Sequence, residues 1–264
     1  MSNARHGAMH PYHLVRPSPW PIFGSVSALV MALGALNYMH EKQPWLLAAG
    51  LGMVLFTMSG WWRQVIREGA VDRAHTPEVR RGLRLGMALF IASEVMFFVG
   101  FFWAFFHNGL LVSPGVKQWP PPGIQPLHPW GIPFLNTGIL MGSGVTCLLA
   151  HHAVRRSDPG ATVRQLLATI ALGIIFLTLQ GVEYGHALFK FTDGIYPSVF
   201  YMATGFHGFH VFVGVCFLAV NLVRARASQL SPTHHIGFEA AVWYWHFVDG
   251  VWVFLFVWVY WWGG

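Results

Sequence analysis

Charged residues are scarce in this chain of 264 residues: only 10% are Asp, Glu, Lys or Arg, against roughly 25% in an average soluble domain. Cysteine is scarcer still, with two residues, which excludes a disulfide scaffold and a cysteine-based zinc or iron–sulfur site. Hydrophobic residues make up 55%. A soluble fold of this size could not bury so much apolar surface, and a disordered chain requires low hydrophobicity. The composition therefore indicates a polytopic membrane protein.

Seven apolar stretches are long enough to cross a bilayer, whose hydrocarbon core requires ~20 helical residues. They cover about residues 21–38, 45–62, 83–106, 133–153, 163–185, 198–223 and 238–262. The runs are continuous rather than alternating, which favours helices over the strands of a membrane barrel. The sequence predicts an all-α membrane protein with seven transmembrane helices.

Basic residues gather in alternate connections. Every arginine lies before the first stretch, or in or beside the connections that follow the second, fourth and sixth. The remaining connections contain only Lys42, Lys117 and Lys190. The positive-inside rule then predicts an inner N-terminus and an outer C-terminus. The net charge of +6 is explained by this topology and by contact with anionic lipid, so we expect no nucleic-acid partner.

A polar stretch after the second helix divides the chain unevenly. We expect an inner-side segment over residues 1–20, a two-helix hairpin over 21–62, an inner-side loop over 63–82 and a five-helix bundle over 83–264. The hairpin is expected to be distinct from the bundle because few apolar residues connect them.

One carboxyl group falls near the middle of the third stretch. A charged side chain at that depth costs roughly 2.5–3.5 kcal/mol, and no cation lies within a helical turn of Glu94. We therefore expect this carboxyl to be neutral. Two interpretations stay open: a site of proton relay or gating, and a neutral carboxyl that hydrogen-bonds between helices.

Four more ionisable residues are expected at mid-depth in the last two helices. His207 and His210 share one helix face through their i, i+3 spacing, and so do His246 and Asp249. Imidazoles can ligate zinc, copper or iron, but a lone HxxH on a helix is a weak signal. The favoured interpretation is a buried polar network between helices, and we expect no metal or cofactor in this chain.

Residues nearer the helix ends suggest packing and anchoring. Glu183 and Glu239 are expected to cap helices or reach toward the interface. Small residues at i, i+4 predict close helix contacts in the fourth and fifth helices, at Gly138, Gly142, Gly181 and Gly185.

The second helix ends on Trp61 and Trp62, followed by Arg63 and Arg67. Tryptophan suits the glycerol region of a lipid, and arginine pairs with phosphate, so this motif fits phospholipid binding as well as simple interfacial anchoring. Histidines also gather on the predicted inner face, where they could collect protons or be ordinary loop residues: His6, His10, His13, His75, His151, His152, His234 and His235.

Several segments resemble a known family. They are PSPWP (17–21), WWRQVIRE (61–68), SEVMFFVGFFWAF (93–105), ATGFHGFHV (203–211) and HHIGFEAAVWYWHFVDGVW (234–252). In this order they resemble subunit III of cytochrome c oxidase, a haem–copper oxidase. Quinol-oxidising relatives typically lack the first two helices, so the presence of both favours the cytochrome c branch over a quinol oxidase.

The resemblance implies a seven-helix subunit whose first two helices splay from the other five around a lipid-filled cleft. It implies that this chain has no redox centre and that haem and copper are held by subunits I and II. It also implies that the complex pumps protons and oxidises cytochrome c. The subunit would pack on subunit I and support proton uptake, in a bacterial plasma membrane or mitochondrial inner membrane. The resemblance places the intramembrane carboxylate at Glu94. The resemblance also implies contacts with lipid head groups at Trp62, Arg67, Glu68, His75 and Arg226. Two further candidates for such contacts are Arg224 and Trp61.

Two functions of other classes compete with this interpretation. A stand-alone proton channel built around Glu94 would conduct in liposomes without partners. A b-type haem protein using His207, His210 or His246 would show a Soret band when purified alone.

Overall fold

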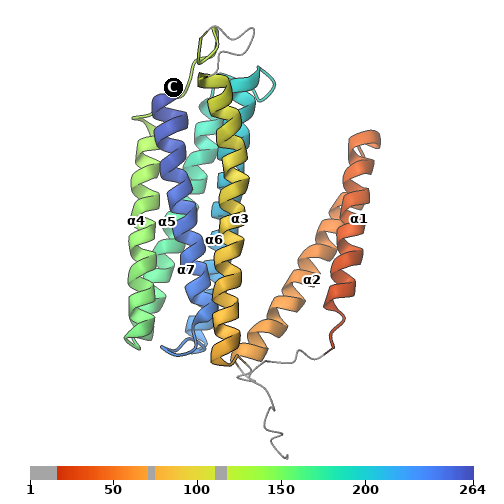
Figure 1. Cartoon of the computed structure of the whole chain (residues 1–264), viewed down its shortest axis with the longest axis vertical. Helices are drawn as coiled ribbons and strands as arrows, with labels where there is room; N and C mark the ends of the chain where they lie inside the picture. Colours follow the sequence, from red (N-terminus) through yellow and green to blue (C-terminus); the bar gives the residue numbers. More distant parts are fainter. Residues whose placement is uncertain (1–16, 71–74, 111–117) are drawn as a thin grey trace, which may run out of the picture. The chain divides into compact units, whose positions relative to one another are not determined.

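The computed structural model describes residues 17–70, 75–110 and 118–264. Within these ranges it contains seven helices, each long and apolar enough to cross a membrane. They are α1 (Trp20–Glu41), α2 (Trp45–Ala70), α3 (Pro77–Leu110), α4 (Ile132–Arg155), α5 (Pro159–His186), α6 (Ile195–Arg226) and α7 (Ile236–Leu255), which continues as the π-helix η1 (Phe256–Trp262) (Figure 1). The predicted all-α membrane fold with seven spans is confirmed.

The helices extend past the apolar runs that predicted them. The expected loop over 63–82 is largely helical, because α2 continues to Ala70 and α3 already begins at Pro77. Proline suits a first helical turn, where its missing N–H is not needed, and the Thr76 hydroxyl accepts a hydrogen bond from the Val79 N–H (3.3 Å). Hydropathy marks only the part of a helix that suits hydrocarbon, so polar helix ends were mistaken for a loop.

The chain divides into two compact units, residues 1–82 and 83–264. In the smaller unit, α1 and α2 pack along their length through glycines. A β-carbon at Gly34 would overlap the backbone of Leu47, and one at Gly50 would overlap the backbone of Met31. This close approach brings the hydroxyl groups of Ser27 and Thr57 into a buried hydrogen bond of 3.1 Å.

The core of the larger unit is organised around a tryptophan of α7. Trp245 is fully buried and fits where Gly173 of α5 and Gly214 of α6 leave room. Its Nε1–H donates a hydrogen bond to the Ser143 hydroxyl of α4 (3.0 Å). This one side chain therefore holds α4, α5, α6 and α7 together, and the ring of Phe102 joins α3 to Phe254 of α7 at 4.2 Å between centroids.

The predicted close contacts at the paired glycines of α4 and α5 are wrong for the described part of this chain. A β-carbon at Gly138, Gly142, Gly181 or Gly185 would meet no other group within 4 Å. The tight glycine contacts of α4 and α5 lie instead at Gly144, which the Asp249 carboxylate of α7 approaches, and at Gly173, which the Trp245 ring of α7 approaches. Spacing alone cannot tell an inward glycine face from an outward one.

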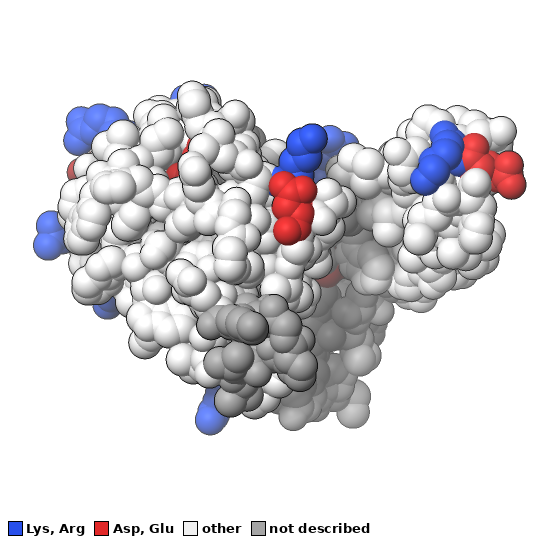
Figure 2. All heavy atoms as spheres, turned by 90° about the horizontal axis from the view of Figure 1, so that it is seen from above, with Lys and Arg blue, Asp and Glu red and all other residues white. Residues whose placement is uncertain are grey.

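Charge is segregated along the larger unit. Its arginines lie at the beginnings of α3 and α5 and the ends of α4 and α6, which the antiparallel order places at one end: Arg84, Arg155, Arg156, Arg164, Arg224 and Arg226. Seen from the other end, where the C-terminus lies, the surface carries few charged side chains (Figure 2). Arg5, Arg16, Arg73 and Lys117 lie outside the described residues, and the inside–outside assignment stays a prediction.

Candidate functional site

The intramembrane carboxylate has a partner on another helix. Oε2 of Glu94 on α3 lies 2.8 Å from Nε2 of His210 on α6. The imidazole side chain is 9% exposed and the carboxylate side chain 22%. Rings of Phe98, Tyr244 and Phe247 surround the imidazole. The sequence showed no cation within a helical turn of Glu94, but the fold supplies a base from a helix more than one hundred residues along the chain.

The second nitrogen of His210 defines the chemistry of this pair. Nδ1 lies 2.7 Å from the Phe206 carbonyl oxygen. A carbonyl can only accept, so Nδ1 carries a proton and donates it. One further proton then lies between Nε2 and the Glu94 carboxylate. Whether it is bound to oxygen or to nitrogen, the pair has no net charge, which suits its depth in the membrane.

The four expected members of a polar network separate into three places. His207 is 1% exposed, stacks on Trp252 at 5.2 Å between centroids, and neither ring nitrogen forms a hydrogen bond with the residues described. His210 joins Glu94. Nδ1 of His246 lies 3.2 Å from Oδ2 of Asp249 on the same helix. Among the described residues no three His, Cys, Asp or Glu side chains come together in a metal-binding arrangement, and the absence of a cofactor stays a prediction.

Sequence reasoning missed a buried cluster at the opposite end from the arginines. Glu183, expected to cap or reach the interface, is 2% exposed. The Tyr260 hydroxyl of η1 donates a hydrogen bond to its Oε1 at 2.6 Å, and the Gln180 amide donates to the same oxygen at 3.2 Å. The i, i+3 spacing of Gln180 and Glu183 was a local signal, but nothing in the sequence points to Tyr260.

Glu239 also has a different role from the one expected. Its two carboxylate oxygens accept hydrogen bonds of 2.9–3.1 Å from Nε and Nη2 of Arg84. This forked ion pair joins the beginnings of α3 and α7 at the arginine-rich end. An exposed ion pair contributes ~0–1 kcal/mol to the free energy of unfolding, and the forked geometry of an arginine–carboxylate pair raises that contribution.

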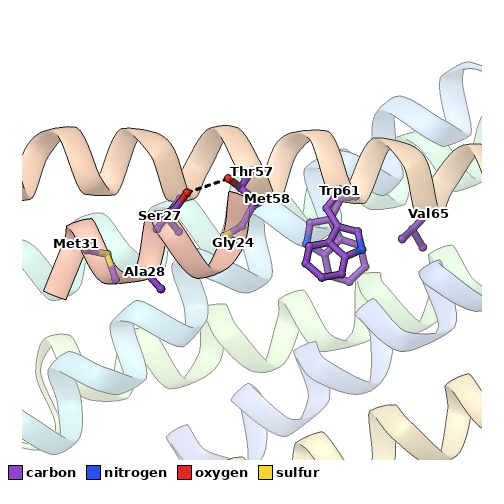
Figure 3. A pocket seen from close by; sticks show the side chains of 10 residues that line it. Gly24, Ser27, Ala28, Met31, Thr57, Met58, Trp61 and Val65 are labelled. Atoms are coloured by element: carbon purple, nitrogen blue, oxygen red, sulfur yellow. Dashed lines mark hydrogen bonds between the residues drawn. The ribbon is translucent and has the colours of Figure 1, made fainter. Parts of the chain in front are cut away.

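The aromatic and basic residues of α2 lie beside a groove of the smaller unit. The groove has a volume of about 560 Å³ and apolar walls contributed by both helices. Met31 of α1 lines it, and Trp61, Trp62 and Val65 of α2 continue it toward the basic end of α2 (Figure 3). The side chains of Trp61 and Trp62 are 42% and 58% exposed, as expected for residues that meet lipid.

The other predicted lipid contacts fall in two sets. Arg67 is exposed two residues beyond Val65 of the groove, Glu68 accepts a hydrogen bond from Gln64 (3.0 Å), and His75 lies against Gly69. In the larger unit, Arg226 is exposed at the end of α6. Arg224 turns inward instead, donating to Asn221 at 3.1 Å and lying against Gly237 at the start of α7.

Some predicted inner-side histidines lie close together. The rings of His151 on α4 and His235, just before α7, have centroids 5.5 Å apart, and His152 and His234 lie beside them in the chain. His6, His10 and His13 lie outside the described residues.

Seven apolar helices with ionisable side chains paired between them define an all-α polytopic membrane protein. The sequence pattern of the cytochrome c oxidase subunit III family matches residues 10–264. The chain belongs to this family. It is 53% identical to cytochrome c oxidase subunit 3 of Marchantia polymorpha over 258 residues, 97% of each chain. It is 53% identical to that of Arabidopsis thaliana over 260 residues, 97% of each chain. With that of Cyprinus carpio the identity is 51% over 255 residues, 96% of this chain and 98% of the relative.

Proposed function

We propose that this chain is the non-redox subunit III of a proton-pumping cytochrome c oxidase, in which subunits I and II hold the haem and copper and reduce O₂ to water. The match to proteins of that name at 51–53% identity over nearly the whole chain carries the proposal. In it, the chain packs on subunit I in a bacterial plasma membrane or mitochondrial inner membrane. Its N-terminus is inside.

Within the complex, the α1–α2 groove would hold a phospholipid. Its apolar wall fits acyl chains and Trp61 and Trp62 suit the glycerol region, while the exposed side chain of Arg67, two residues beyond Val65, would have to reach around α2 to contact the phosphate. Arg226 offers a second phosphate contact at the arginine-rich end of α6. Such lipids would stabilise the subunit by covering apolar surface that detergent covers poorly.

The chain would also support proton uptake on the inner side. Imidazole side chains, which can both accept and donate protons, gather at the arginine-rich end, where the rings of His151 and His235 have centroids 5.5 Å apart. The Glu94–His210 pair shares a proton at mid-depth without net charge, which suits a group that holds or passes a proton. Neither role requires a redox centre in this chain.

Purification of the complex tests the proposal. The chain, tagged at its C-terminus in its own membrane, should co-purify with chains that hold haem and copper, and the complex should oxidise reduced cytochrome c while consuming O₂. Activity with a quinol but not with cytochrome c would identify the quinol branch. A Soret band in the isolated chain, or proton conduction by the chain alone in liposomes, would overturn the proposal.

A further inference from the structure

The His246–Asp249 pair of α7 lies at the surface of the larger unit, halfway along its helix. His246 lies about 15 Å from the start of α7 at 1.5 Å per residue, and α7 with η1 spans 27 residues. Its side chain is 41% exposed, whereas that of Asp249 is 10% exposed. An ionisable side chain at this depth rarely faces lipid, and such residues normally face protein or a water-filled cavity.

Asp249 holds this imidazole in a defined orientation. Oδ2 of Asp249 lies 3.2 Å from Nδ1 of His246, so one proton lies between them, and a pair without net charge, which its depth favours, carries its second proton on Nε2. Gly144 of α4 makes room for the carboxylate, because a β-carbon there would overlap Oδ2. Oδ1 of Asp249 is buried and forms no hydrogen bond with the residues described. The pair thus presents hydrogen-bonding capacity that the described part of the chain does not use.

The surface beside His246 is shaped for a close approach. Gly250, one turn further along α7, is exposed and would meet no other group within 4 Å with a β-carbon. Val253, on the same face, is 39% exposed. A polar group flanked by a glycine notch and a small apolar residue is the combination by which transmembrane helices associate.

We propose that the His246–Gly250–Val253 face of α7 is the docking site of a transmembrane helix from another oxidase subunit, which presents a hydrogen-bond acceptor to the Nε2–H of His246 at mid-membrane. The polar complementarity decides the occupant, since a lipid tail would leave the Nε2–H of His246 and Oδ1 of Asp249 unpaired in hydrocarbon. The inference rests on the proposal that the chain works in a complex.

The test uses the tagged chain in native membranes and measures how much partner subunit it retains after detergent extraction. His246→Leu removes the donor and should increase the dissociated fraction about threefold to thirtyfold, the range expected for one interhelical hydrogen bond. His246→Gln keeps a donor in its amide N–H and should retain the partner. Gly250→Phe should increase the dissociated fraction of the partner subunit about tenfold or more, because the ring would fill the space left by the glycine. Gly181→Phe, on an equally open glycine of α5, should not.

A photo-crosslinking residue at position 253 identifies the neighbour directly, and it should capture another oxidase subunit in the intact complex. Capture of a second copy of this chain, of its own α1–α2 hairpin or of lipid alone would overturn the inference. Equal retention by His246→Leu and wild type, or equal loss in the two glycine variants, would overturn it as well. If the wild-type chain co-purifies with no partner at all, the proposed function itself fails, which separates the two outcomes.

Discussion

Nε2 of His210 and Oε2 of Glu94 lie 2.8 Å apart between α6 and α3, although 116 residues separate them in the chain. Because Nδ1 of the same ring is committed to a carbonyl oxygen, the pair shares one proton and is neutral as a whole. This explains how a carboxyl group is accommodated at mid-depth, and it makes the pair open to chemical test.

A hydrophobic carbodiimide should label Glu94, because its side chain is 22% exposed and it carries or readily accepts the shared proton. Glu183, at 2% exposure, is a matched intramembrane carboxyl that the reagent should not reach. Glu94→Gln should fold, since the amide still donates to Nε2, and should lose the label. Peptide mass mapping measures both, and unchanged labelling in the variant would locate the reactive group elsewhere.

Replacing Arg67 and Arg226 together with Ala should reduce retained phospholipid about tenfold or more, because each loses a charge-assisted contact of ~1.5–3 kcal/mol with a lipid phosphate. Native mass spectrometry of the purified complex counts the lipids. Arg164→Ala, an exposed arginine at the start of α5, is the control. Equal lipid counts in the double variant and wild type would mean that apolar packing alone retains the lipid.

Gly173→Ala should lower the thermal stability of the protein in detergent, because the new β-carbon would lie 2.8 Å from the Trp245 ring and 2.9 Å from Val215. Overpacking of this kind costs about 1–3 kcal/mol. Gly181→Ala, two turns further along α5 with open space around it, should instead be neutral or stabilise by up to ~1 kcal/mol. Thermal melts of the two variants test this prediction. Equal melting temperatures for Gly173→Ala and Gly181→Ala would contradict the packing described for Trp245.

Removal of the subunit should slow proton uptake more than oxygen chemistry. Bulk protons are scarce at high pH, where surface imidazoles and carboxylates would contribute most to their capture. The complex without this chain should therefore show the alkaline limb of its pH–activity profile at lower pH. Turnover measured against pH with and without the subunit tests this, and superimposable profiles would leave only a structural role.

Much of the fold was predictable because membrane helices are encoded locally. Each span is a continuous run of about 20 apolar residues, so seven of them identify seven helices without knowledge of their neighbours. The helix ends were less predictable, since Arg63 and Arg67 read as a loop although they lie on α2. Glu94, His210 and Asp249 stood out for a similar local reason, because ionisable residues are rare in apolar runs.

The sequence by itself determined the membrane class, the seven spans and the family resemblance, all of which depend on residue order along the chain. Only the tertiary structure decided which helix face meets which neighbour. It paired Glu94 with His210, buried Glu183 against Tyr260, and turned Gly144 and Gly173 inward while Gly138 and Gly181 face outward. The physical reason is that helical periodicity assigns a residue to a face, whereas the partner of that face follows from how side chains fit across separate helices.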